Sequence, residues 1–189
     1  MRKLRAVKSK GDANKRAIDY CMRLLCHRQY SEGELRRKLM ERGYSDDEVA
    51  SAINRLNELG LIDDEELSKW LVQSAIERQS YGRHALIARM RNLMLSEDCI
   101  QCAIKMFDLE TEADIAVKLL RKWLPEERRG DGGVPLNGAE VRRLISRLLR
   151  RGFSSEAIAK ALRRIGCKPF DVGEFGEALP QQSIEEALD

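Results

Sequence analysis

The sequence predicts an all-α protein, an elongated, curved array of three tandem three-helix repeats. The first observation is composition: charged residues make up 34% of the 189 residues and aromatic residues only 5%, while the helix formers Leu, Ala, Arg, Glu and Lys dominate. The second is that apolar side chains recur at helical spacing between capping residues. The third is that this pattern occurs three times, with a period of about 50 residues, which is typical of tandem repeats.

The clearest unit contains two helices separated by a short break at Gly43, a residue type that lets the backbone leave a helix. Ser31 and Glu34 have capping-box spacing at the start of the first of these helices. Ser45 and Glu48 repeat that spacing at the start of the second. A helix expected over 13–28 precedes them. The side chains expected to face inward are Ala17, Tyr20, Cys21, Leu24, Leu25, Leu35, Leu39, Val49, Ile53 and Leu56.

The same register returns twice along the chain. At a shift of 51 residues the capping Ser45 aligns with Ser96, and at a shift of 109 residues it aligns with Ser154. Each later copy begins with a helix of its own. We expect Asp63 to cap the first of these, with Trp70 facing inward, and Thr111 to cap the other.

Three small bundles therefore follow one another, each leaning on its neighbours for burial. The array should offer one long face to an extended partner such as a filament or a nucleic acid. The expected organisation is a flexible basic arm at 1–12, repeat 1 at 13–62, repeat 2 at 63–108, repeat 3 at 109–166 with a Gly-rich inserted loop at 125–138, and an acidic tail at 167–189.

Composition also indicates the compartment. No apolar run approaches the ~20 residues needed to span a bilayer, and no apolar segment follows the basic N-terminus as in a secretory signal. Five cysteines suit a reducing compartment better than a disulfide framework. We therefore expect a cytoplasmic protein without membrane association, and a monomer.

Catalytic motifs are missing from the sequence, so we expect a protein that is not an enzyme and needs no cofactor. There is no phosphate-binding GxxxxGK[ST] loop, no GxSxG and no HExxH. His27 and His84 lie in different repeats and are expected at the surface. Cys99 and Cys102 form a CxxC within a helix, without a second CxxC; we interpret them as helix residues, the alternative being a metal or redox role.

Positive charge is unevenly distributed. The net charge is +3, but six Asp/Glu and no Lys/Arg lie in 171–189, and the nine Lys/Arg of 137–168 face only two Glu. Spacings of three and four residues place these cations on common helix faces, where they would bind phosphates or carboxylates; the alternative is ordinary solvated charge. The candidate partner- or DNA-binding residues are Arg143, Arg147, Arg150, Arg151, Lys160, Arg163 and Arg164, with a smaller set of Arg36, Arg37 and Lys38.

Two stretches together are similar to the signature of the RecX family of bacterial recombination regulators. They are YSEGELRRKLMERGYSDDEV at 30–49 and LNELGLIDDEEL at 56–67. The segments YGRHALIARM at 81–90 and RRLISRLLRRGFSSEAIAKAL at 142–162 resemble the family's second and third repeats. The chain departs from the pattern at Asn92-Leu93-Met94-Leu95, where a basic-Gly turn is usual, and in the inserted loop and acidic tail.

The resemblance implies a regulatory protein that binds the RecA–single-stranded DNA filament, in its groove, and inhibits recombination, the SOS coprotease and ATP hydrolysis by RecA. An alternative follows from the residues themselves: a non-sequence-specific DNA-binding helical-repeat protein acting independently of RecA. Its binding would be driven by phosphates and would weaken with salt, because the contact helices lack a base-reading set and stacking aromatics are few.

Overall fold

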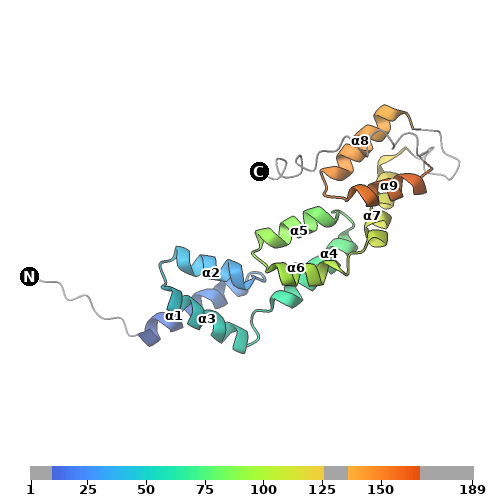
Figure 1. Ribbon diagram of the computed structural model, residues 1–189. Coiled ribbons are helices and arrows are strands. Elements are labelled where there is room, and N and C mark those ends of the chain that lie inside the picture. The colour runs from blue at the N-terminus through green and yellow to red at the C-terminus, as the bar shows by residue number, and fades with distance from the viewer. Residues whose placement is uncertain (1–9, 126–135, 167–189) are drawn as a thin grey trace, which may run out of the picture. The chain divides into compact units, whose positions relative to one another are not determined.

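The protein is all-α across residues 10–125 and 136–166, the part of the chain that the computed structural model describes (Figure 1). Much of the predicted arm and inserted loop, and the whole acidic tail, lie outside these residues. The helices are α1 (Lys10–Leu25), α2 (Glu32–Glu41), α3 (Asp46–Glu58), α4 (Asp64–Arg78), α5 (Arg83–Asn92), α6 (Glu97–Ile104), α7 (Leu109–Trp123), α8 (Gly138–Leu149) and α9 (Ser155–Arg164).

The nine helices of the described residues confirm the predicted all-α class. They divide into two compact units, and the division passes through the second predicted repeat. One unit joins the chain up to Trp70 to Arg89–Ala103, and the other joins Leu71–Ala88 to the chain from Ile104 onward. No helix of the described residues is both long and apolar enough to cross a membrane.

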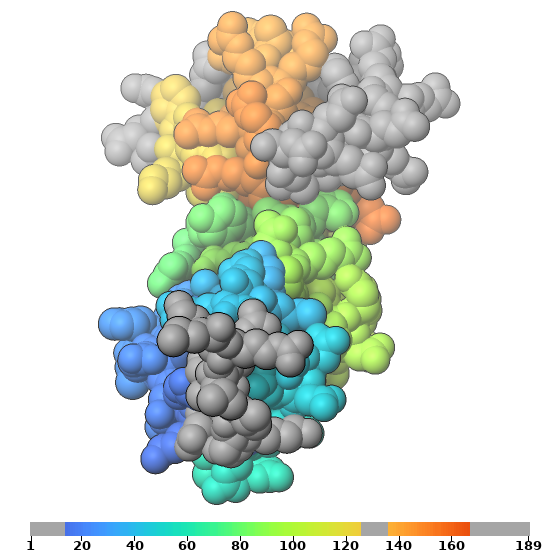
Figure 2. All heavy atoms as spheres, turned by 90° about the vertical axis from the view of Figure 1, so that its left-hand side faces the viewer, coloured from blue at the N-terminus to red at the C-terminus, as the bar shows by residue number. Residues whose placement is uncertain are grey.

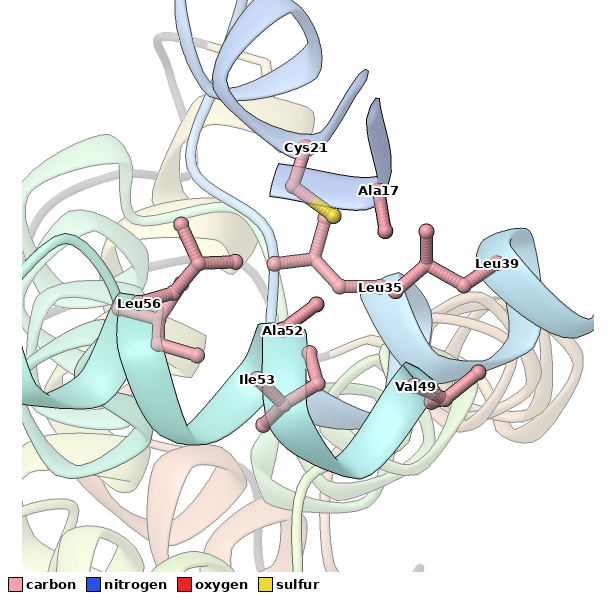
Figure 3. Close-up of a cluster of buried hydrophobic side chains, with 9 residues drawn as sticks. Ala17, Cys21, Leu35, Leu39, Val49, Ala52, Ile53 and Leu56 are labelled. Atoms are coloured by element: carbon pink, nitrogen blue, oxygen red, sulfur yellow. The ribbon is translucent and has the colours of Figure 1, made fainter. Parts of the chain in front are cut away.

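The first unit is built on a core shared by α1, α2 and α3. Figure 3 shows side chains from all three helices directed toward one another, and in the space-filling view these helices form one continuous block (Figure 2). Burial raises the pKa of the Cys21 thiol in this core to about 11. Replacing one of the core leucines by Ala would cost about 2–5 kcal/mol. The buried cluster is Ala17, Cys21, Leu35, Leu39, Val49, Ala52, Ile53, Leu56 and Ile62.

Local capping signals set most helix starts as predicted. Ser31 and Ser45 each accept a hydrogen bond from the backbone N–H three residues on, and Glu34 and Glu48 accept from the N–H of these caps, so both capping boxes are confirmed. One cap was wrongly predicted. Asp108, not Thr111, caps α7, because its carboxylate accepts from the Thr111 N–H at 2.8 Å.

Two further expectations differ from the structure. The first helix begins at Lys10, three residues before the expected start, and ends at Leu25. Trp70 does not face inward: half of its surface is exposed, at 50%. The buried face of α4 runs through Leu67, Leu71, Val72 and Ala75, and at 100° per residue Trp70 falls beside this stripe rather than within it.

The second unit is organised around α7 and α9, which pack along each other, with α8 against α9. The small residues Ala113, Ala116, Ala157 and Ala161 are fully buried and let these helices approach closely. The larger buried residues of these helices are Ile115, Leu119, Leu120, Val141, Ile145, Leu148, Ile158 and Leu162, with Phe153 in the α8–α9 turn.

Candidate basic interface

Helix α8 presents the strongest row of exposed cations in the second unit. A capping box formed by Asn137 and Glu140 begins the helix, and its buried side carries Val141, Ile145 and Leu148. Helical geometry then turns the intervening positions outward. The arginines exposed along α8 and at its C-cap are Arg142, Arg143, Arg147 and Arg150.

Trp123, at the end of α7, supports two of the predicted arginines. The Arg147 guanidinium carbon lies 3.9 Å from the centroid of a Trp123 ring, and that of Arg151 lies 5.5 Å away. Arg151 also donates from Nη1 to the backbone oxygen of Ser80 at 3.2 Å. Stacking on indole holds a planar guanidinium in place while leaving its edges available to an anion.

Arg143 and Arg150 flank this stack in the sequence of α8 and make no ion pair with any described residue. We name Arg143, Arg147, Arg150 and Arg151, together with Trp123, the α8 basic face. No acidic side chain of the described residues forms an ion pair with it.

The predicted cations of α9 are arranged differently. Lys160 forms an ion pair with Glu110 of α7, and Arg164 pairs with Glu110 at 2.5 Å and with Asp114 at 2.6 Å. Arg163 donates from Nε to the Ala159 carbonyl at 3.2 Å. Helix α9 therefore uses two of its cations to hold α7.

The cations of α2 are also paired locally. Arg36 Nε lies 2.8 Å from Glu32 Oε1, and Arg37 Nε lies 3.6 Å from Glu41 Oε1. The Lys38 ammonium is 5.8 Å from the centroid of the Tyr30 ring. Pairs of this kind, exposed to solvent, contribute ~0.2–1 kcal/mol each and leave less net charge to present to a partner.

Arg28, which sequence reasoning did not select, completes this cluster. Its guanidinium donates to both oxygens of Glu34, at 2.7 and 3.1 Å, and lies 3.6 Å from the Tyr30 ring centroid. The hydrogen bond to Glu34 raises the pKa of Arg28. Arg28 therefore serves the local structure at the start of α2.

Sequence reasoning also missed three residues at the end of α7. Trp123 is half-buried, and the Arg147 guanidinium lies over its ring. Arg121 and Lys122 precede it, exposed, and form no ion pair with a described residue. The sequence signal that could have selected them is the pair of cations directly before a Trp in the last turn of the helix.

The charged side chains that the α8 basic face offers are guanidinium groups. Within the described residues no group of three or more His, Cys, Asp or Glu side chains is placed to hold a metal ion. Cys99 is half-buried and Cys102 exposed in α6. Guanidinium groups fixed on a helix face bind phosphate or carboxylate groups through charge-assisted hydrogen bonds.

The helices define an all-α protein with exposed arginines along α8. Comparison with known proteins gives its family. Residues 17–56 match the family description "RecX, first three-helix domain". The chain is 37% identical over 139 residues to the "Regulatory protein RecX" of Mycolicibacterium smegmatis, covering 73% of each chain. It is 35% identical over 147 residues to that of Mycobacterium sp. (strain JLS), covering 77% of this chain and 79% of the relative.

The chain therefore belongs to the RecX family of regulatory proteins, as the sequence resemblance predicts. Two solved structures share the fold. The crystal structure of RecX from Lactobacillus salivarius has a TM-score of 0.71 at 17% identity, covering 82% of this chain and 97% of that one. A second crystal structure of regulatory protein RecX has a TM-score of 0.64 at 23% identity, covering 83% and 74%.

Proposed function

We propose that this protein binds the RecA–single-stranded DNA filament and lowers RecA activities: filament growth, the SOS coprotease, strand exchange and ATP hydrolysis. Family membership supports a regulatory role. The α8 basic face is the observation that supports a binding surface for the filament. Such a filament presents both phosphates and carboxylates, the groups that guanidinium forks bind.

The α8 basic face is suited to this role because part of it is already ordered. Trp123 restricts Arg147 and Arg151 before a partner arrives, so binding loses less side-chain entropy than it would with unsupported arginines. Arg143 and Arg150 add charge on the same helix. We assign the main contact to this face, and a smaller contribution to Arg163, Arg36, Arg37 and Lys38, several of which already have local partners.

The proposal extends to the array. Three three-helix repeats in tandem would let one monomer contact several RecA subunits along a groove. We propose this arrangement because the capped helices recur in register along the chain. Lys160 and Arg164 would then act indirectly, by fixing α9 against α7.

The test is RecA-catalysed, DNA-dependent ATP hydrolysis, with filament lengths measured by electron microscopy. The wild-type protein should inhibit hydrolysis and shorten filaments at substoichiometric to near-stoichiometric amounts. The double variant Arg143→Glu/Arg150→Glu should need at least ~100-fold more protein, since it removes two charge-assisted contacts of about 1.5–3 kcal/mol each and every 1.4 kcal/mol is tenfold.

A matched control uses Arg78→Glu/Lys105→Glu. Both residues are exposed, neither makes an ion pair with a described residue, and the change in charge is the same. This control should inhibit like wild type. If both double variants lose inhibition equally, net charge rather than the α8 basic face is responsible.

The second candidate function is direct, non-sequence-specific DNA binding without RecA. The same cationic face supports it. In that case the wild-type protein would bind duplex or single-stranded DNA with a log K that falls by about 0.9 or 0.7 per neutralised phosphate with log salt. RecA hydrolysis would change only in proportion to DNA occupancy.

A further inference from the structure

The second helix of each repeat ends in the same kind of turn, which makes positions on α2, α5 and α8 directly comparable. In each turn the residue of positive φ is followed by one whose backbone N–H donates to a carbonyl at the end of the helix. The residues of positive φ are Gly43, Met94 and Gly152. The hydrogen bonds are Tyr44 N to Leu39 O, Leu95 N to Met90 O and Phe153 N to Leu148 O. Leu39, Met90 and Leu148 are fully buried, so the residues that precede them are equivalent in structure.

A cation occupies this preceding position in every repeat. The residues are Lys38 in α2, Arg89 in α5 and Arg147 in α8, and the shifts of 51 and 109 residues align the same three. Across 32–42 and the equivalent residues of the other two repeats, no other position is Lys or Arg in all three copies. We name Lys38, Arg89 and Arg147 the register cations.

The register cations have no acidic partner in the part of the chain that the structure describes. Arg89 and Arg147 are exposed and Lys38 is half-buried, and none of the three forms an ion pair with a described residue. Two of them lie over aromatic rings, Lys38 over Tyr30 and Arg147 over Trp123. An aromatic ring attracts a cation without cancelling its charge, so these side chains keep their charge for another partner.

The other cations of α2 and α5 are engaged within the chain. Arg91 is the clearest case, because its guanidinium donates to both oxygens of Glu97 at 2.7 and 3.1 Å. The remaining ones are Arg36 with Glu32, Arg37 with Glu41, and Arg83 with the carbonyl oxygens of Ile104 and Phe107. Among the described contacts of these two helices, the register cation is therefore the one basic side chain that donates to no oxygen of its own chain.

Helix α8 carries two further unpaired arginines, Arg143 and Arg150, which the other repeats do not share. The residues at the position of Arg143 are Glu34 and Ala85, and those at the position of Arg150 are Glu41 and Asn92. These two arginines are therefore particular to the third repeat, whereas the register cation is common to all three.

One cation at a fixed position of each repeat suits a partner whose anionic group also recurs once per unit. A nucleic acid carries a phosphate at every nucleotide, so a surface for phosphates needs no single fixed position, and pairing the neighbouring cations internally would weaken it. A protein filament presents each of its side chains once per subunit. The pattern therefore favours a carboxylate on a repeated protein subunit over phosphates.

We propose that Lys38, Arg89 and Arg147 each contact the same acidic residue, on different RecA subunits of the filament. The contact in each case is an ammonium or guanidinium group that donates to a carboxylate. The inference rests on the proposed function and deepens it in two ways: it adds Arg89 to the binding residues, and it gives the three repeats equivalent contacts.

The test is cross-linking with a carbodiimide, which joins an amine to a neighbouring carboxylate and does not join arginine. Lys38 supplies one amine, and Arg89→Lys and Arg147→Lys supply amines at the other two positions. On RecA filaments assembled on single-stranded DNA, all three should link to one and the same RecA acidic residue, identified by mass spectrometry. Links to three unrelated RecA residues, or no link from any of the three, overturn the inference.

Arg91→Lys is the matched cross-linking control. It places an amine two residues further along α5, beside Glu97 of the same chain, and should give no link to RecA. A link from this position to the same RecA residue would show that the reaction reports proximity alone and would overturn the inference.

Binding to RecA filaments gives a second measurement. Lys38→Gln and Arg89→Gln should each weaken binding about fivefold, and Arg147→Gln at least as much. Arg91→Gln removes a charge that Glu97 already neutralises and should change binding less than about twofold. Equal losses for Arg89→Gln and Arg91→Gln, or an equal loss of affinity for naked single-stranded DNA, overturn the inference.

Failure of the inference and failure of the proposed function are distinguishable. If the wild-type protein binds RecA filaments and Lys38→Gln and Arg89→Gln bind them equally well, the register contacts are wrong and the proposed function stands. If the wild-type protein fails to bind RecA filaments at all, the proposed function itself is wrong, and the inference with it.

Discussion

Gly33 of α2 and Met94 of the α5–α6 turn are sterically matched. A Cβ on Gly33 would lie 2.6 Å from the Met94 Cβ and 2.6 Å from its carbonyl oxygen. Met94 has φ of 57°, a conformation that side chains rarely adopt. Where α2 meets the α5–α6 turn, the turn therefore carries a side chain, that of Met94, and the helix carries glycine. Where α5 meets the α8–α9 turn, the helix carries the side chain of Ala85 and the turn carries Gly152.

Gly33→Ala should destabilise the first unit. Alanine favours a helix over glycine by about 1 kcal/mol, but the clash with Met94 should cost about 1–3 kcal/mol or more, so the net sign is a loss. Urea denaturation would measure it. Gly138→Ala is the control, because its nearest neighbours are the Arg142 side-chain nitrogens at 3.8 and 4.0 Å; a loss there as large as at Gly33 would contradict the steric account.

Gly152→Ala should cost more than Gly43→Ala. Both substitutions place a side chain at positive φ, at about 1–2 kcal/mol. Only Gly152 also lacks room, with Ala85 atoms 2.3 to 2.8 Å from the added Cβ. The expected difference in the free energy of unfolding is about 2 kcal/mol. Comparable losses for the two variants would show that the contact between Gly152 and Ala85 rearranges freely.

Glu112→Ala should lower the free energy of unfolding by about 3 kcal/mol. The Glu112 carboxylate is buried and accepts hydrogen bonds from Arg83 N at 2.8 Å, Ser154 N at 2.9 Å and Ser154 Oγ at 2.7 Å. Alanine leaves these donors without acceptors. Glu112→Gln retains one acceptor oxygen and should lose less; equal losses for Ala and Gln would argue against the hydrogen-bond explanation.

Asp64 should make stability depend on pH. Burial, then repulsion from Glu32, Asp63 and Glu34, raises the pKa of Asp64, against a lowering contribution from the Glu32 N–H. A raised pKa in the folded state means that the protonated form favours folding. This contribution is fully present below the unfolded pKa of about 3.9 and is lost as pH rises through the folded pKa.

Asp64→Asn keeps an acceptor for the Glu32 N–H without the charge. The variant should be at least as stable as wild type at pH 7, and the difference should shrink as pH falls below about 4. Urea midpoints from pH 3 to 8 would show this. Asp63→Asn, at the exposed cap of α4, should show no gain, and a gain of the same size there would assign the effect to net charge alone.

Thiol labelling of the native protein should distinguish exposed cysteines from the buried one by their rates of reaction. Cys26 and Cys102 are exposed and should react quickly with a disulfide reagent, while Cys21 is buried, with its pKa raised to about 11, and should react only on unfolding. Peptide mapping identifies the labelled residues. Fast labelling of Cys21 would mean that α1 separates readily from α2 and α3.

The predictable part of this protein is its local part. The capping boxes of Ser31 and Ser45 and the stripe through Leu35 and Leu39 depend on residues within one turn of one another, and the structure confirms them. The prediction that Trp70 faces inward was wrong, because one apolar residue at the edge of a stripe does not show which way the buried face of the helix is rotated.

The candidate site was less predictable because it depends on contacts between distant residues. Arg164 is 50 residues from Asp114 and 54 from Glu110, so no local pattern showed that α9 uses its cations internally. The stacking of Arg147 on Trp123 likewise depends on how α7 and α8 approach each other. Spacing indicated which cations share a face, and only packing shows which of them are already engaged.

The turn at Gly43 has an evolutionary consequence. It has the same pair of backbone hydrogen bonds as the turn at Gly152, but a Cβ added to Gly43 would meet nothing within 4 Å. A duplicated three-helix segment inserted ahead of the first bundle would find there a turn of the right shape for its second helix. Gene duplication could therefore lengthen this chain toward its N-terminus.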